Sequence, residues 1–106
     1  MTSFEQIIQM GQQVQARMSE LQNELANRTV TGTAGGGMVT ATADGRGKIR
    51  AIKIDASVAG GDVEMLEDLV VAAVSAAQDR AAQTYEEELK KLAGGFPLPF
   101  PPDVLP

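Results

Sequence analysis

The residues best suited to a chemical role are lysines and arginines gathered in the middle of the chain. Arg28, Arg46, Lys48, Arg50 and Lys53 lie within residues 28–54, where Asp44 is the only acid. Cationic side chains on one surface can bind nucleic-acid phosphates, with an affinity that depends on salt and not on base sequence. The alternative is that they keep an exposed edge strand from pairing with other chains, or that they pair with acidic helices. Charge alone favours the second interpretation without excluding the first.

The rest of the chain is acidic. The formal net charge is −5 and the sequence pI is about 4.6, whereas nucleic-acid-binding domains are usually basic. Aromatic residues make up only 4% of the chain, which argues against binding of single strands by base stacking. The remaining cations complete the set of candidate phosphate contacts: Arg17, Arg80, Lys90 and Lys91. The composition therefore does not predict strong affinity for DNA.

Catalytic and metal-binding motifs are missing. The chain has no histidine and no cysteine, which removes the commonest general base, the commonest metal ligand and every thiolate. Glu86, Glu87 and Glu88 are consecutive, so on a helix their carboxylates point in different directions and do not form a catalytic pair. Carboxylates alone can hold a hard cation, but no calcium-loop spacing is present. We expect no enzyme, no cofactor and no metal site.

The run Gly35-Gly36-Gly37 allows two interpretations. A phosphate-binding loop has the pattern G-x-x-x-x-G-K-[ST] between a strand and a helix. Here Met38 and Val39 follow and begin a segment that is typical of a strand. A glycine bend between two strands is therefore favoured.

A long helix is predicted over residues 3–27. Ser3 and Gln6 have the spacing of a capping box. Apolar residues recur at steps of three and four along one stripe, with Gly11 as a gap: Phe4, Ile7, Val14, Met18, Leu21 and Leu25. This spacing is typical of an amphipathic helix. Such a helix is about 35 Å long, and we expect it to lie against other elements along most of that length.

Residues 28–55 predict three antiparallel strands. The segments RTVTGTA, MVTATA and KIRAIKID alternate in polarity or are rich in β-branched residues, and Asp44-Gly45 is typical of a hairpin turn. In the last segment Lys48 and Arg50 have the same parity as Ile52 and Ile54. We therefore expect one face of this strand to begin basic and to end apolar.

A second long helix is predicted over residues 62–93, with Asp62 as its N-cap. The order α–β–β–β–α predicts an α/β protein of the α+β type, in which helices cover a three-stranded antiparallel sheet. Residues 1–93 are assigned to one domain. Residues 94–106, GGFPLPFPPDVLP, contain all five prolines and are predicted to be a flexible Gly/Pro-rich tail. The alternative for the tail is that Phe96, Leu98 and Phe100 dock on a neighbouring surface.

The apolar surface of the two helices exceeds what one small domain can cover. Apolar residues nearly encircle the second helix over residues 63–77. Because a chain of this size buries only a modest core, we expect a homodimer, most simply with twofold symmetry. No apolar stretch approaches the roughly 18 residues of a membrane span and no signal-peptide pattern begins the chain, so we expect no membrane association.

The sequence GGGMVTATADGRGKIRAIKID, followed by EMLEDLVVAAVSAAQDRAAQ, resembles the YbaB/EbfC family of bacterial nucleoid-associated proteins. The features that match are Gly36-Gly37-Met38-Val39, Gly45 with Gly47, Ile52-Lys53-Ile54-Asp55, and Glu64 to Leu69 running into Ala72-Ala73. The helix–sheet–helix order and the Gly-Gly-Phe-Pro tail also fit. The resemblance covers nearly the whole chain and is strongest over residues 35–80.

The resemblance implies a homodimer in which the sheets associate and the helices project like tweezers. It further implies binding to double-stranded DNA in the cytoplasm, at the nucleoid, with roles in chromosome organisation and gene regulation and without catalysis. In that family the projecting helices are implicated in holding the duplex. The alternative function is a dimeric protein-interaction scaffold with weak or no DNA binding, whose partner is a DNA-repair or recombination protein.

Overall fold

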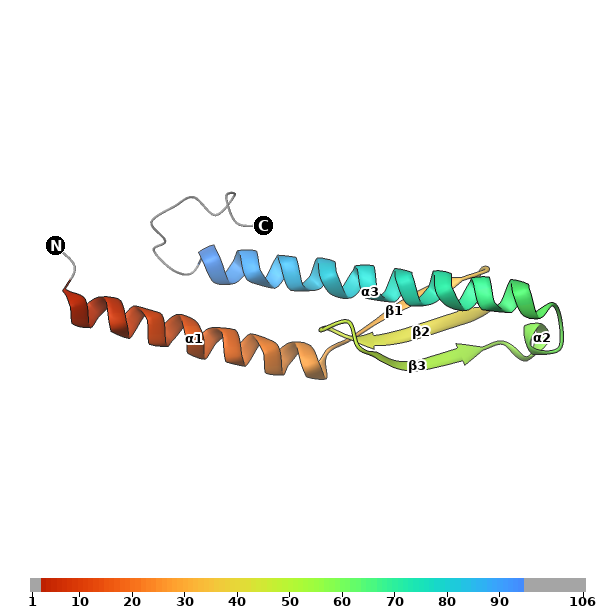
Figure 1. Cartoon of the computed structure of the whole chain (residues 1–106), viewed down its shortest axis with the longest axis horizontal. Helices are drawn as coiled ribbons and strands as arrows, with labels where there is room; N and C mark the ends of the chain where they lie inside the picture. Colours follow the sequence, from red (N-terminus) through yellow and green to blue (C-terminus); the bar gives the residue numbers. More distant parts are fainter. Residues whose placement is uncertain (1–2, 95–106) are drawn as a thin grey trace.

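A computed structural model of the chain describes residues 3–94. The elements follow in the order α1 (Phe4–Asn27), β1 (Thr29–Ala34), β2 (Val39–Asp44), β3 (Ile49–Ile54), the one-turn helix α2 (Ala56–Ala59) and α3 (Val63–Gly94). α1 and α3 run side by side at one end of the molecule, and the sheet lies beside α3 at the other end (Figure 1). The result is an elongated α+β fold measuring 68 × 24 × 16 Å. The predicted order of long helix, three strands and long helix is confirmed.

Helix α1 begins with the predicted capping box. The Gln6 backbone N–H donates to Ser3 Oγ at 3.2 Å, and the Ser3 N–H donates to Gln6 Oε1 at 3.0 Å. Towards the other end of α1, Leu21 and Leu25 are buried, whereas Phe4 is 76% exposed. The expectation that α1 is covered along most of its length is wrong for the single chain, because α3 ends opposite the middle of α1.

The sheet has the order β1-β2-β3 and is antiparallel throughout. Gly35, Gly36 and Gly37 join β1 to β2 with φ angles of 63°, 68° and 94°, in the left-handed region that glycine adopts without steric cost. A strand and not a helix follows them. The glycine run is therefore the predicted bend, without the strand–helix context of a phosphate-binding loop.

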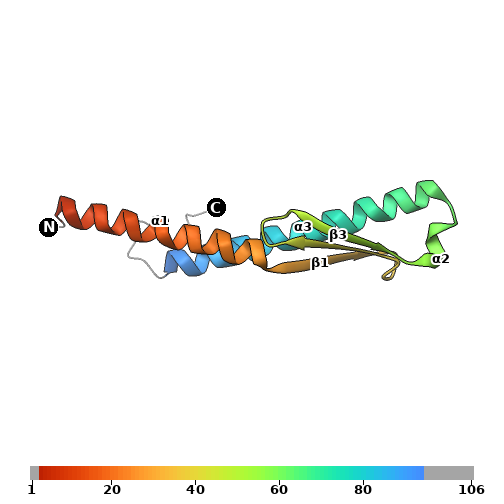
Figure 2. The same ribbon diagram turned by 90° about the horizontal axis from the view of Figure 1, so that it is seen from below.

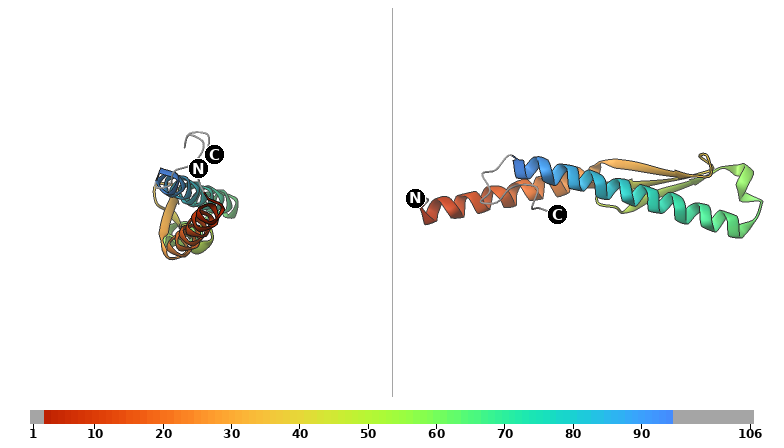
Figure 3. Two further views of the ribbon diagram at one scale, coloured as in Figure 1. Left: turned by 90° about the vertical axis from the view of Figure 1, so that its left-hand side faces the viewer. Right: turned by 90° about the horizontal axis from the view of Figure 1, so that it is seen from above.

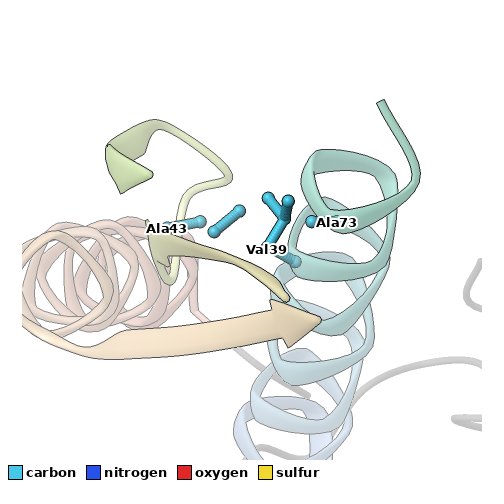
Figure 4. Close-up of a cluster of buried hydrophobic side chains, with 5 residues drawn as sticks. Val39, Ala43 and Ala73 are labelled. Carbon is cyan, nitrogen blue, oxygen red and sulfur yellow. The ribbon is translucent and has the colours of Figure 1, made fainter. Parts of the chain in front are cut away.

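The core lies between the sheet and α3, which runs along one face of β1 and β2 (Figure 2). Val39, Ala41 and Ala43 alternate along β2 and are fully buried, and they form one cluster with Ala73 and Ala77 of α3. Figure 4 shows Val39 and Ala73 facing each other across this boundary. Because most of these side chains are small, the helix lies very close to the strands.

Gly32 of β1 marks the point of closest approach. A Cβ atom at this position would lie 2.6 Å from the Ala73 carbonyl oxygen and would also collide with the backbone nitrogen of Ala77. Only glycine fits here without moving the helix. The packing of α3 on β1 therefore depends on the absence of a side chain.

The prediction that basic and apolar residues share one face of β3 is wrong. A β-bulge interrupts the β2–β3 ladder between Thr42 and Ala43, and an extra residue in one strand reverses its alternation beyond that point. Ile49, before the bulge, pairs with Ala43 and packs against the core. Ile52, beyond the bulge, pairs with the buried Ala41 and so lies on the same side as Ile49, although the two differ in parity. Arg50, between them, has no partner in the register, and its side chain binds Asp44.

The segment between β3 and α3 contains the one-turn helix α2 and the cap of α3. Asp55 caps the one-turn helix α2, which was not predicted, by accepting from the Ser57 N–H at 2.9 Å. Asp62 caps α3 as predicted, because its Oδ1 accepts from the Glu64 N–H at 2.9 Å. Of the helices between residues 3 and 94, none is both long and apolar enough to cross a membrane. Gly94 is the last residue of α3, and the rest of the predicted tail lies outside the described residues.

Candidate nucleic-acid interface

The turn between β2 and β3 is organised by the carboxylate of Asp44. Its Oδ1 accepts from the backbone N–H groups of Arg46 at 2.9 Å and Lys48 at 3.1 Å. The turn also closes through the backbone, since the Asp44 N–H donates to the Lys48 carbonyl at 2.9 Å. Gly47 has a φ of 92°, which this tight turn requires. The conformation that presents the side chains of Arg46 and Lys48 is thus fixed by one acidic residue.

The second oxygen of Asp44 binds the side chain of Arg50. Oδ2 accepts from Arg50 Nη2 at 2.8 Å and from Nε at 3.1 Å. Burial alone would raise the pKa of Asp44, which is only 2% exposed. The hydrogen bonds from Lys48, Arg46 and Arg50 outweigh that effect and hold the pKa below its usual value. Asp44 is therefore ionised at neutral pH and neutralises part of the Arg50 charge.

The turn is anchored to both long helices. The Gly45 N–H donates to the carbonyls of Leu25 at 2.8 Å and Arg28 at 2.9 Å, where α1 ends. On the other side, Gln78 Nε2 of α3 donates to the Gly47 carbonyl at 3.1 Å. A cleft of about 290 Å³ lies at this junction, lined by Gln22, Gly45, Arg46, Gly47, Gln78, Ala81, Ala82 and Tyr85. The turn is thus held where α1, the sheet and α3 meet.

We define the basic turn as Arg46, Lys48 and Arg50. Arg46 and Lys48 are exposed, and neither takes part in an ion pair within residues 3–94. Arg50 is partly neutralised, but its side chain is still 48% exposed. A backbone-anchored turn that carries unpaired cations can bind a phosphate without first ordering a loop.

Two other predicted contacts are brought together by Glu88. Arg28 Nη1 donates to Glu88 Oε1 at 3.2 Å, and Lys91 Nζ donates to the same oxygen at 3.3 Å. These hydrogen bonds, that from Lys91 first, lower the pKa of Glu88. The cluster joins α3 to the end of α1. Because one carboxylate serves both cations, the predicted alternative of pairing with an acidic helix applies to Arg28 and Lys91.

The remaining predicted residues are dispersed over the surface. Arg17 faces Glu20 at 3.8 Å, and Arg80 Nη1 donates to the Thr31 carbonyl at 3.2 Å. Lys53 pairs in register with Thr40 on β2, and Lys90 lies near the end of α3. Neither lysine belongs to an ion pair among the described residues. The structure therefore brings Arg46, Lys48 and Arg50 together in one turn. The four residues of this paragraph, Arg17, Lys53, Arg80 and Lys90, are not part of that group.

A larger cleft, of about 600 Å³, separates α1 from the end of α3. Its lining is mixed in charge and consists of Gln13, Ala16, Arg17, Glu20, Leu21, Glu24, Glu88, Lys91 and Leu92. Three of these residues are glutamates, so the cleft is unsuited to an anion. No group of three acidic side chains between residues 3 and 94 is placed to hold a metal ion.

Sequence reasoning did not identify Asp44 as the residue that organises the site. The Asp44-Gly45 pair was recognised as a turn, but the hydrogen bonds from Arg46, Lys48 and Arg50 require knowledge of the hairpin register. The contact from Gln78 was also missed, because it joins residues 31 positions apart.

The YbaB/EbfC DNA-binding family model matches residues 1–96. The chain belongs to this family. Because it is a family of nucleoid-associated DNA-binding proteins and not of enzymes, the expectation of no catalytic activity is confirmed. The family model and the relatives below confirm the resemblance found in the sequence.

Relatives match over most of their length. A nucleoid-associated protein of Gemmatimonas aurantiaca is 51% identical over 88 residues, which are 82% of this chain and 85% of that protein. A nucleoid-associated protein of Chlorobium phaeobacteroides is 46% identical over 96 residues, 91% of this chain and 86% of its own. The crystal structure of the uncharacterized protein HP0035 from Helicobacter pylori has a similar fold, with a TM-score of 0.68 at 24% identity, covering 90% of this chain and 97% of that one.

Proposed function

We propose that the chain binds double-stranded DNA as a homodimer, at the nucleoid in the cytoplasm, and that it acts in chromosome organisation and gene regulation. The observation that carries this proposal is the basic turn, whose backbone is fixed by Asp44. Its Arg46 and Lys48 are exposed and form no ion pair within residues 3–94. Membership of a DNA-binding family supports it. Because phosphate contacts do not read the bases, we expect the affinity to depend little on the DNA sequence.

The homodimer is supported by apolar surface that remains uncovered in the single chain. α3 packs mainly on β1 and β2, which leaves Ile52 and Ile54 of β3 41% and 38% exposed on the side that faces α3. On α3 itself Met65 and Val71 are 45% and 64% exposed. A twofold axis beside α3 would lay the second copy's α3 over β3 of the first, and the reverse, and would cover both sets at once.

Such a dimer would leave two arms projecting, each made of α1 and the second half of α3. In each protomer the basic turn lies at the base of the arm, where α1 meets the sheet (Figure 1). Pairing would place two basic turns on one particle. Two turns would double the number of phosphate contacts available to one duplex, although each chain has a net charge of −5.

The test compares two variants of the full-length chain that change the net charge equally. Arg46→Gln with Lys48→Gln removes two positive charges from the basic turn. Ala56→Glu with Ala59→Glu adds two negative charges on α2, which lies at the far end of the sheet (Figure 1). Duplex affinity is measured by fluorescence anisotropy at low salt, and folding by circular dichroism.

The proposal expects the first variant to lose about tenfold or more in affinity, because each phosphate contact contributes separately. The second variant should lose much less. Equal losses would mean that only net charge matters, and unchanged affinity in the first variant would remove the basic turn from the interface. Arg50 is left intact because its removal would leave Oδ2 of the buried Asp44 carboxylate without a partner.

The protein-interaction scaffold remains the second candidate. Its support is the pairing of four of the nine basic side chains with carboxylates, namely Arg17, Arg28, Arg50 and Lys91. A scaffold that binds a DNA-repair or recombination protein should show no duplex retention even at the lowest salt concentration. Retention that weakens as salt is added would favour the DNA-binding function.

A further inference from the structure

The first half of α1 carries an apolar stripe with no cover from the described residues. Phe4, Ile7 and Ile8 are 76%, 56% and 45% exposed. At the other end of the same helix, Leu21 and Leu25 are buried. Large apolar groups that remain in contact with water on one side of a helix indicate a missing partner.

The chain leaves α3 opposite the middle of α1, about two helical turns from this stripe. Leu92, in the last turn of α3, and Gln13, in the middle of α1, line the same cleft. The turns of α1 before Gln13 therefore extend past the end of α3, and Figure 1 and the right-hand view of Figure 3 show α1 continuing beyond α3. Residues 95–106 begin at this point, next to Gly94.

The composition of residues 95–106 suits burial against an apolar helix. Phe96, Leu98 and Phe100 are separated by prolines, and Asp103 is the only charged side chain. All five prolines of the chain lie here. Proline brings no N–H group, so packing against apolar carbon leaves fewer donors without a partner. Its fixed φ angle also lowers the entropy lost when the segment becomes ordered.

The segment is long enough to cover the stripe. In an extended proline-rich conformation each residue advances about 3.1 Å, so about twelve residues span about 37 Å. Along α1 the exposed stripe, residues 4–11, is about 10 Å long. The extended length of residues 95–106 therefore exceeds the length of the stripe, and the segment can cover it without any rearrangement of α1 and α3.

We propose that residues 95–106 bind the apolar stripe of α1, formed by Phe4, Ile7 and Ile8, in the same chain. The surface proposed above for the second copy, around Ile52 and Val71, lies at the sheet end of the molecule. A second copy seated there does not cover the stripe. The tail would thus support the projecting half of α1, independently of whether the arm binds DNA.

Paramagnetic broadening in nuclear magnetic resonance tests this inference on the full-length protein. The chain has no cysteine, so Asp103→Cys accepts a spin label at one position only. In the first sample, label and nitrogen-15 are on the same chain. In the second, spin-labelled chains without nitrogen-15 are refolded together with nitrogen-15 chains that carry no label, so that any broadening arises between chains.

The inference expects the amide signals of residues 4–11 to be lost in the first sample and retained in the second. Loss in the second sample as well would show that the tail binds a different copy, and retention in both would show that it does not bind α1; either result overturns the proposal. Phe100→Ser should restore the signals in the first sample. Thr33→Ser, an exposed site on β1, is the matched control and should not.

Discussion

At the scale of single residues, Asp44 has the largest influence on the candidate interface. One buried carboxylate accepts four hydrogen bonds, two from the backbone of the turn and two from Arg50. A charged group away from water is stable only with such partners. The cations of the basic turn are therefore positioned by an anion, which explains how an acidic protein can present them in a fixed arrangement.

Asp44→Asn should lower stability in a pH-dependent manner. The folded-state pKa of Asp44 lies below the ordinary value for an aspartate, so its ionised form is favoured by folding. This contribution is fully present above about pH 4 and is lost as pH falls through the lowered folded-state pKa. Urea unfolding should show a deficit for the variant at pH 7 that shrinks at pH 3.

The control for this prediction is Asp79→Asn, at an exposed position of α3. It should leave the midpoint of unfolding nearly unchanged at both values of pH. A constant deficit for Asp44→Asn across the whole pH range would mean that the carboxylate charge does not contribute, and that only the shape of the side chain matters.

At the scale of elements, the sheet and α3 are held together by small residues in close contact. Val39 is the largest side chain in the central cluster, and the others are alanines. The centre of the core therefore gains stability from the close packing of many atoms, with larger side chains such as Ile49, Leu66 and Leu69 packed around it. This arrangement is sensitive to any added volume where helix and strand meet.

Gly32→Ala should destabilise the fold by about 1–3 kcal/mol, the usual cost of overpacking. The added methyl group would force α3 away from β1, because the atoms in its way belong to the helix backbone. Thermal unfolding followed by circular dichroism measures the effect. Thr33→Ala, at the exposed neighbouring position, should change stability far less. A Gly32→Ala variant as stable as the parent chain would contradict the close contact between β1 and α3.

Gly11→Ala should have the opposite effect. Gly11 lies within α1, and a Cβ atom there would meet nothing within 4 Å. Alanine favours a helix over glycine by about 0.5–1 kcal/mol. The melting temperature should therefore rise, and a fall would show that a segment outside residues 3–94 or another chain packs against this position.

The elements themselves were largely predictable, and the faces of β3 were not. Capping residues Ser3 and Asp62 located the starts of both long helices, because a cap is a local signal. The bulge beside Thr42 carries no such signal, since it depends on how two strands pair. It reversed the expected alternation of β3 and separated Arg50 from the isoleucines. The ion pairs of Arg28 and Lys91 with Glu88 likewise depend on tertiary contacts.

At the scale of the whole molecule, one end is packed and the other projects. The sheet end has the core, whereas α1 and the last part of α3 form an arm (Figure 1). The proposed dimer joins sheet ends, and the proposed tail contact supports the arm. Together they account for the exposed apolar residues at both ends of the chain.

Val71→Glu should convert the dimer to monomers. Val71 is 64% exposed in the single chain, so the substitution should not disturb the core of one protomer. In the dimer it would bury an unpaired charge, which is strongly unfavourable. Sedimentation equilibrium of the parent chain should give the mass of two chains, and that of the variant should give one.

Glu67→Gln, an exposed polar substitution on the same helix, is the control and should leave the mass of two chains unchanged. If the variant remains a dimer, the proposed interface is wrong. If the parent chain is a folded monomer at micromolar concentrations, the dimer itself is wrong.

The most direct test of the central claim is the salt dependence of duplex binding by the intact protein. If the basic turns bind phosphates, the logarithm of the association constant should fall linearly as the logarithm of salt concentration rises, by about 0.9 for each contact. Arg46→Gln with Lys48→Gln should make this slope shallower. Binding that does not change with salt, or no binding at the lowest salt concentration, would contradict the account.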